Sequence, residues 1–132
     1  MNKAIFYILG LLLFIGCQPT SFEQAVKKGF DNYLDTAAVR YQYIMLIPNS
    51  GCTGCISDAE YFFKEYNDHE EILFIFTRVI SKKDLRIRLG KDNLQRKNVL
   101  IDNDNKFYFE KFQESIYPIV AVIKDKKVVA LK

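Results

Sequence analysis

The most constraining feature of the sequence is a strand, helix and strand pattern between residues 41 and 77. Residues 41–47 (YQYIMLI) form an apolar run that ends at Pro48 and suits a mostly buried strand. A helical pattern to about Asn67 and a second apolar run, residues 72–77 (ILFIFT), follow. The helix has one apolar face, made of Cys55, Ile56, Ala59, Phe62, Phe63 and Tyr66. Such a unit is almost always right-handed with parallel strands, so the sequence predicts an α/β fold.

Two cysteines, Cys52 and Cys55, lie between the first strand and the helix, at the strand end where open α/β sheets place their sites. A cysteine at a helix start lies near unpaired N–H groups and the positive end of the helix dipole, which lower its thiol pKa. Cys55 lies one turn later on the same side and can reach Cys52. This arrangement suits two-step disulfide exchange. Gly51 and Gly54 are expected to let the loop turn tightly and a partner backbone approach closely.

The N-terminus has the pattern of an export leader. A short basic start ending at Lys3 precedes residues 4–15, a twelve-residue apolar run. A membrane-spanning helix needs roughly 20 apolar residues, and the polar residues after Cys17 end the run before that length. The pattern therefore favours a signal peptide, with an uncleaved anchor as the alternative.

Residues 14–17 (FIGC) resemble the lipobox of bacterial lipoproteins, although Phe14 stands where Leu is usual. The resemblance implies that residues 1–16 are removed and that Cys17 becomes the lipidated first residue. Two or more acyl chains anchor a protein stably to a membrane. We therefore expect a lipid-anchored, periplasm-facing protein of the cell envelope, with a short tether (17–20) inside a single domain (17–132).

Export changes how the other two cysteines are interpreted, because disulfides persist in oxidising compartments. Once Cys17 is assigned to the lipid, Cys52 and Cys55 have only each other as intramolecular partners. A structural zinc site needs four ligands, and beyond this pair the chain offers His69 and scattered carboxylates. We therefore expect no metal and no cofactor. A redox-active pair and a passive disulfide both stay open.

Two further helices are predicted outside this unit. Thr20-x-x-Glu23 reads as a capping box for an amphipathic helix through about Thr36. Ser81-x-x-Asp84 begins a short helix that Gly90 ends.

The remaining segments predict a loop, a strand and a hairpin. Residues 91–98 are polar and predict a loop, and residues 99–102 predict a short strand. Residues 107–112 fit either a strand or a helix. Residues 119–123 and 128–131 flank a polar turn and predict a terminal β-hairpin.

From residue 41 to residue 131 the sequence resembles the thioredoxin-like family, in particular its exported TlpA-like thiol/disulfide oxidoreductases. The segments that carry the resemblance are YQYIMLIP, SGCTGCI, ILFIFT, VLIDNDNKFYFEKF and IYPIVAVIKDKKVVAL. It implies a thioredoxin-like fold: a central mixed sheet with flanking helices and a terminal β-hairpin.

The resemblance also implies roles for individual residues. Cys52 would be the nucleophile and Cys55 the resolving thiol. Pro118 would be a cis-proline that faces the dithiol and offers the backbone of Tyr117 to a substrate chain. The loop residues Gly51, Thr53 and Gly54 would contact that substrate.

The sequence departs from the family pattern in four places. The strand before the dithiol, residues 44–47, carries no acidic residue, and the chain has no Trp. Ser50-Gly51 stands where Trp and its neighbour are usual, and Thr53-Gly54 replaces the Gly-Pro of thioredoxin. The sequence stops at Lys132, directly after the last predicted strand, so we expect the closing C-terminal helix to be absent.

Two functions remain in competition. The first is a lipid-anchored oxidoreductase that exchanges disulfides with extracytoplasmic protein substrates and relies on a membrane thiol electron donor or acceptor. The second is a non-enzymatic binding lipoprotein with a structural Cys52–Cys55 disulfide. A peroxidase is disfavoured because no Thr precedes Cys52 closely. The net charge of +3 is too small to indicate nucleic-acid binding.

Overall fold

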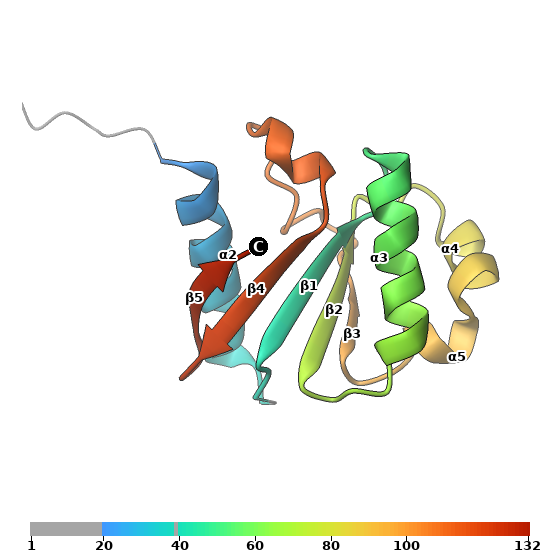
Figure 1. Cartoon of the computed structure of the whole chain (residues 1–132), viewed down its shortest axis with the longest axis horizontal. Helices are drawn as coiled ribbons and strands as arrows, with labels where there is room; N and C mark the ends of the chain where they lie inside the picture. The colour runs from blue at the N-terminus through green and yellow to red at the C-terminus, as the bar shows by residue number, and fades with distance from the viewer. Residues whose placement is uncertain (1–19, 39) are drawn as a thin grey trace, which may run out of the picture.

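A computed structural model describes residues 20–38 and 40–132 of the chain. Its centre is a five-stranded mixed sheet in the order β3-β2-β1-β4-β5 (Figure 1). The strands are β1 (Tyr43–Pro48), β2 (Ile72–Thr77), β3 (Val99–Ile101), β4 (Ile119–Lys124) and β5 (Lys127–Leu131). The first three are parallel, whereas β4 runs antiparallel to β1 and β5 antiparallel to β4. The predicted α/β class, the parallel strand pair and the terminal hairpin are confirmed.

Helices lie on both faces of the sheet (Figure 1). They are α2 (Phe22–Thr36), α3 (Thr53–Tyr66), α4 (Lys82–Leu89), α5 (Lys91–Leu94) and the 3₁₀ helix η2 (Gln113–Ile116). Helix α2 packs on one face in the first apolar core, through Val26, Phe30 and Leu34. Helices α3, α4 and α5 pack on the other face in the second core. The molecule is thus a three-layer arrangement with the sheet in the middle.

Strand β1 contributes to both cores because successive side chains of a strand point to opposite faces. Ile44 and Leu46 pack on the α2 side, and Met45 and Ile47 pack on the α3 side. All four are buried. A strand that is apolar on both faces must lie in the sheet interior, which is where β1 is found, between β2 and β4.

Two helix starts show how capping sets the boundaries. The predicted cap at Thr20 is wrong by one residue: the Ser21 hydroxyl accepts a hydrogen bond from the Gln24 amide, and the Gln24 side chain accepts one from the Ser21 amide. Overlapping Ser/Thr and Glu/Gln residues allowed both registers. Helix α4 begins as predicted, with the Ser81 hydroxyl accepting from the Asp84 amide, and it ends at Gly90 with φ of 86°.

Two connecting segments differ from expectation. The predicted loop of residues 91–98 contains the short helix α5. Leu94 of this helix is buried in the second core. Residues 107–112, for which the sequence allowed a strand or a helix, form turns instead, and Phe107 is buried against α2. Both alternatives are therefore wrong. Helix η2 follows them and was not predicted.

The free edge of β5 is partly occupied by a side chain of α2. The Asp31 carboxylate accepts a hydrogen bond of 2.8 Å from the Val128 backbone amide.

Helix α2 lies behind β4 and β5 in Figure 1, and no helix of the described residues lies in front of these two strands. The α3-side face of the sheet is therefore covered over β2, β3 and most of β1, and it is open over β4, β5 and the Tyr43 end of β1.

A buried carboxylate organises the connection that follows β3. Asp102 is 5% exposed and accepts hydrogen bonds from the Thr77 hydroxyl (2.8 Å) and from the backbone amides of Lys106 (2.9 Å) and Phe107 (2.8 Å). Its own amide donates to the Phe76 carbonyl. Asp102 thus ties the end of β2 to the turn that brings Phe107 into the first core.

We predict that Asp102→Ala destabilises the fold by about 3 kcal/mol or more, because it leaves two buried donors and one partly buried donor without their acceptor. The matched control is Asp104→Ala, two residues away, whose side chain is exposed and makes only a 3.8 Å ion pair with Lys106. This control should change stability by no more than about 0.5 kcal/mol. Urea unfolding followed by circular dichroism measures both, and equal effects of the two variants would contradict the prediction.

Candidate functional site: the disulfide loop

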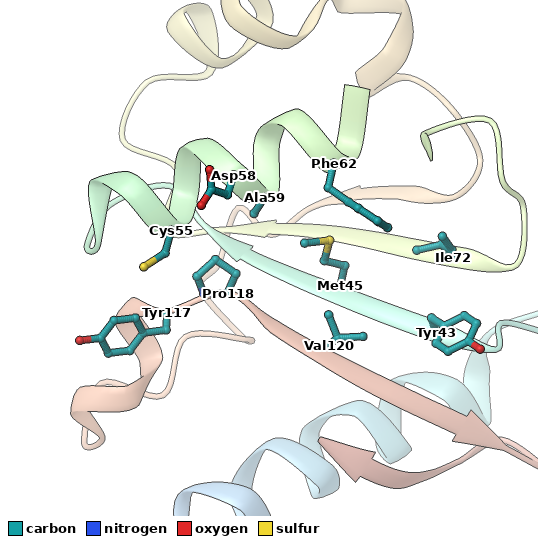
Figure 2. A pocket seen from close by; sticks show the side chains of 10 residues that line it. All are labelled: Tyr43, Met45, Cys55, Asp58, Ala59, Phe62, Ile72, Tyr117, Pro118 and Val120. Atoms are coloured by element: carbon teal, nitrogen blue, oxygen red, sulfur yellow. The ribbon is translucent and has the colours of Figure 1, made fainter. Parts of the chain in front are cut away.

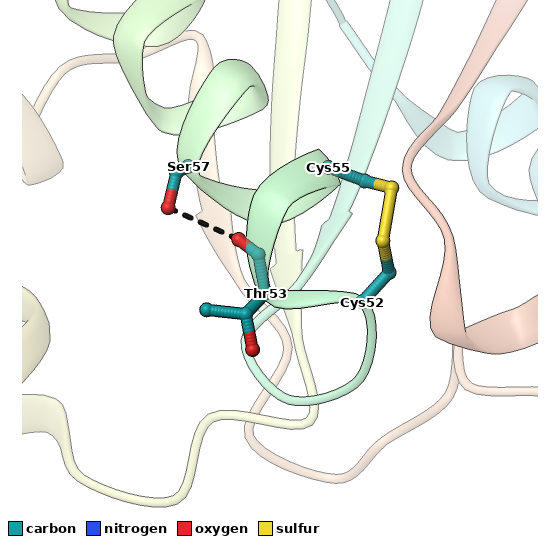
Figure 3. Close-up of a disulfide and its surroundings, with 4 residues drawn as sticks. All are labelled: Cys52, Thr53, Cys55 and Ser57. Atoms are coloured by element: carbon teal, nitrogen blue, oxygen red, sulfur yellow. Dashed lines mark hydrogen bonds between the residues drawn. A yellow bond between two sulfur atoms is a disulfide. The ribbon is translucent and has the colours of Figure 1, made fainter.

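Cys52 and Cys55 form a disulfide at the start of α3 (Figure 3). Their Cα atoms are 5.4 Å apart, within the ordinary range for such a bond. Cys52 is the N-cap residue of the helix and Cys55 lies in its first turn, as predicted. Both residues are partly exposed. The bond is thus open to solvent at the end of the central strand.

The loop between β1 and α3 is fixed by neighbouring elements. The Asn49 amide donates to the Thr77 carbonyl (2.8 Å), and the Cys52 amide donates to the Ile116 carbonyl (3.4 Å). The Arg78 guanidinium donates to the Ser50 carbonyl (3.4 Å). Hydrogen bonds to the end of β2 and to η2 therefore hold the disulfide in place.

The helix start favours negative charge near the sulfur atoms. The first N–H groups of a helix have no intrahelical acceptor, and the helix dipole has its positive end there. The first turn of α3 carries no charged side chain in the sequence. A helix start of this kind is an environment that stabilises a cysteine thiolate.

Gly51 allows the tight turn that the sequence predicts, whereas its contact with a partner stays a prediction. Its φ of 144° is a conformation that L side chains rarely adopt. A Cβ atom at this position would lie 2.6 Å from the Ile116 carbonyl oxygen. The loop therefore needs glycine here to pass close to η2.

Thr53 and Gly54 lie exposed on the outer side of the helix start. The Thr53 carbonyl accepts a hydrogen bond from the Ser57 hydroxyl (3.0 Å), as Figure 3 shows. A Cβ atom at Gly54 would meet no described atom within 4 Å. The expectation that Gly54 is needed for a tight turn is wrong, because this residue is already inside the helix; its contact with a partner stays a prediction.

Tyr117 and Pro118 lie beside the disulfide, and Figure 2 shows them next to Cys55. Tyr117 is 46% exposed. None of the peptide bonds within the described residues is cis, so the cis bond expected at Pro118 is not found. The Tyr117 amide donates to the Glu114 carbonyl, and the residue is extended, with φ of −102° and ψ of 147°, as is usual for a residue before proline.

Two side chains of the site were not predicted. Arg78 follows β2 at the same sheet edge as the disulfide loop, and its guanidinium lies 4.8 Å from the centre of the Tyr108 ring. The Ser50 hydroxyl is buried and has no hydrogen-bond partner among the described residues. A basic residue directly after a central strand was the available sequence signal for Arg78, whereas the contact with Tyr108 joins residues 30 positions apart.

An apolar groove of about 660 Å³ runs from the disulfide along α3. Cys55, Tyr117 and Pro118 lie at one end of it and Tyr43 and Ile72 at the other (Figure 2). Its floor and walls are made by Met45, Val120, Ala59 and Phe62. The groove is the part of the open sheet face that lies next to α3.

Other predicted features lie elsewhere. His69 is exposed after the C-terminal end of α3, the end opposite the disulfide, and its hydrogen bond to Glu71 raises its pKa above the ordinary value. Cys17 and the leader (1–16) lie outside the described residues. Within residues 20–38 and 40–132, no helix is long and apolar enough to cross a membrane, and no group of three or more His, Cys, Asp or Glu residues could hold a metal ion.

We predict that Gly51→Ala destabilises the oxidised protein by about 1–3 kcal/mol, because the new methyl group overlaps the Ile116 carbonyl in a strained backbone conformation. Gly54→Ala is the matched control and should be neutral or stabilising by up to about 1 kcal/mol, since it adds a better helix former in open space. Urea unfolding without reductant measures the difference. A neutral Gly51→Ala would show that the loop does not depend on glycine.

Comparison of the chain with protein family models, with curated proteins and with solved structures found no match in any of the three.

Proposed function

We propose that the chain is a thioredoxin-like thiol/disulfide oxidoreductase that exchanges disulfides with extracytoplasmic protein substrates. The observation that carries the proposal is the partly exposed Cys52–Cys55 disulfide at the junction of β1 and α3. A disulfide at a helix start is held where a thiolate is stabilised after reduction. A bond placed only to staple the chain gains nothing from this position.

The arrangement of the elements supports a thioredoxin-like fold. Strands β1 and β2 with helix α3 form a parallel unit, and the hairpin β4–β5 adds antiparallel strands on the other side of β1. The loop before β4 carries Tyr117 and Pro118 to the disulfide. The family places its reactive cysteines and its proline loop in corresponding positions.

The exchange proceeds in two balanced steps. In the reducing direction, the Cys52 thiolate attacks one sulfur of a substrate disulfide, forms a mixed disulfide and releases the other substrate sulfur as a thiolate. The Cys55 thiolate then attacks Cys52, which re-forms the Cys52–Cys55 bond and releases the second substrate thiolate. Two electrons pass from the dithiol to the substrate. In the oxidising direction both steps run in reverse.

The surroundings give each part of the site a task. The start of α3 stabilises the Cys52 thiolate, and the Arg78 guanidinium near the Ser50 carbonyl adds positive charge to the same loop. Gly51, Thr53 and Gly54 leave the approach to Cys52 open, and the backbone at Tyr117 and Pro118 lies where a substrate chain would pass. Lipidated Cys17 would hold the domain at the periplasm-facing membrane, where a membrane thiol donor or acceptor resets the dithiol.

One observation favours the second candidate, a binding lipoprotein with a structural disulfide. Strand β1 offers Ile44, Met45, Leu46 and Ile47 beneath the disulfide, so it supplies no carboxylate to move a proton from Cys55. In that case the apolar groove beside the disulfide would be the binding site, and the disulfide would only maintain the shape of the groove.

We predict that the chain from residue 18 onward, which contains every described element, reduces a test disulfide at neutral pH when supplied with dithiothreitol. Cys52→Ser should abolish this activity because the attacking thiol is lost. Cys55→Ser should stop turnover and leave mixed disulfides through Cys52, visible on a non-reducing gel of a periplasmic extract. Ser57→Ala, which removes a hydroxyl from the same helix, is the control and should retain activity.

The result separates the two candidates. An active wild type with trapped partners in Cys55→Ser supports the oxidoreductase. A wild type that neither reduces nor oxidises the test disulfide, with no trapped species, excludes it and leaves the binding lipoprotein.

We also predict that Arg78→Gln slows alkylation of Cys52 by about threefold at pH 7 in the reduced Cys55→Ser background, because a positive charge near the thiolate is removed. Arg86→Gln, on the exposed face of α4, is the matched control and should leave the rate unchanged. The pH dependence of iodoacetamide labelling gives the pKa of Cys52 in each variant. Equal pKa values would show that Arg78 only positions the loop.

A further inference from the structure

The α3-side face of β4 and β5 is apolar and lacks a helix among the described residues (Figure 1). The β4 residues on this face alternate with the buried ones and are Val120 and Val122, both partly exposed. Ala130 of β5 lies opposite Val122, and Tyr43 of β1, which is 40% exposed, also lies opposite Val122. With the part of the groove lined by Met45, Ala59 and Phe62, these residues form one continuous apolar surface, here called the open face; the end of the groove at Cys55, Tyr117 and Pro118 lies outside it.

Helix α3 exposes aromatic side chains next to this face. Phe62 is 37% exposed, Tyr66 is 42% exposed, and their rings stack with centres 4.4 Å apart. Tyr61 is 67% exposed. Large aromatic groups side by side on a surface mark an interaction site more often than isolated exposed apolar residues do. Phe62, Tyr66 and Tyr61, here called the aromatic ridge, therefore lie directly beside the open face.

The ridge and the open face have opposite charges at their rims. Asp58 is exposed and lines the groove, and Glu65 is exposed and lies two helical turns later on the same side of α3. Across the open face, Lys124 and Lys127 are paired at the hairpin end, and Lys132 pairs with Val120 at the other end; all three lysines are exposed. The α3 side thus carries two carboxylates, and the β4–β5 side carries three lysines, with one carboxylate, Asp125, in the turn between Lys124 and Lys127.

We propose that two copies of the chain pair through this surface, with α3 of each copy lying over β4 and β5 of the other. A twofold axis parallel to the strands produces this arrangement, since it exchanges the two sides of the open face and keeps the disulfide ends together. Phe62 and Tyr66 of one copy then cover Val120, Val122 and Tyr43 of the other.

The same axis brings the opposite charges together. Asp58, near the disulfide end, meets Lys132 of the second copy, and Glu65, near the hairpin end, meets its Lys124 and Lys127. The spacing agrees: the seven residue steps from Asp58 to Glu65 span about 10.5 Å along the helix, and the four steps from Val120 to Lys124 span about 13 Å along the strand. Each chain carries both the aromatic ridge and the open face. In a twofold dimer the ridge of each copy therefore covers the open face of the other, and no copy of either surface is left uncovered.

The proposal rests on the fold and the surface, and it holds whether or not the disulfide turns over. Its test therefore measures association alone. We use the chain from residue 18 onward in sedimentation velocity, with two sets of charge reversals. The first is Asp58→Lys with Glu65→Lys, and the second is Lys124→Glu, Lys127→Glu and Lys132→Glu.

We expect the wild type to form a dimer that dissociates on dilution. Each charge-reversed protein alone should be monomeric, with self-association weakened at least tenfold, because like charges then face each other at four or more positions. Mixing the two proteins should restore a dimer, since each acidic rim again meets a basic one. Lys83→Glu with Arg86→Glu, on exposed α4, is the control that changes net charge without touching the surface and should leave dimerisation intact.

Three outcomes would overturn the proposal. The first is a wild type that is monomeric at about 100 µM, which would leave the open face to another polypeptide segment or an apolar ligand. The second is dimerisation that neither set of reversals weakens, which would place the contact elsewhere. The third is a mixture that stays monomeric although both proteins show the wild-type circular dichroism spectrum.

Discussion

Burial of β1 on both faces is the constraint on which the rest of the structure depends. Its side chains enter the α2 core and the α3 core alternately, so the strand must lie inside the sheet and helices must cover both sides. Each fully buried aliphatic side chain contributes about 1.5–3 kcal/mol. The disulfide loop begins at the carboxyl end of this strand, so a buried element fixes the place of the partly exposed cysteines.

Polar side chains at the two ends of the sheet make this apolar centre possible. At one end the buried side-chain amide of Asn98 donates hydrogen bonds to the backbone carbonyls of Asn67, His69 and Ile72. These bonds close the turn between α3 and β2. At the other end Asp102 accepts three hydrogen bonds. Buried backbone groups need such partners. Each cluster replaces water where a strand leaves the interior.

Sequence patterns predicted the parts of the fold that depend on local periodicity. The apolar run of β2 and the helical face of α3 are repeated over enough residues to fix type and length, and the cysteine pair follows from its place between strand and helix. The trans bond before Pro118, the Arg78 contact and the groove depend on which distant segments meet, and no local pattern records that. Helices α5 and η2 span four residues each, too few to show a period.

The hydrogen bond from Val128 to Asp31 has a consequence for how copies of the chain can meet. A sheet edge with free amides is a template on which another strand can add, and repeated addition gives open-ended aggregates. Asp31 occupies one of these amides on β5, and the opposite edge, β3, is only three residues long. Edge-to-edge growth of copies of the chain is thereby disfavoured, and contacts through a face, which close on themselves, remain available.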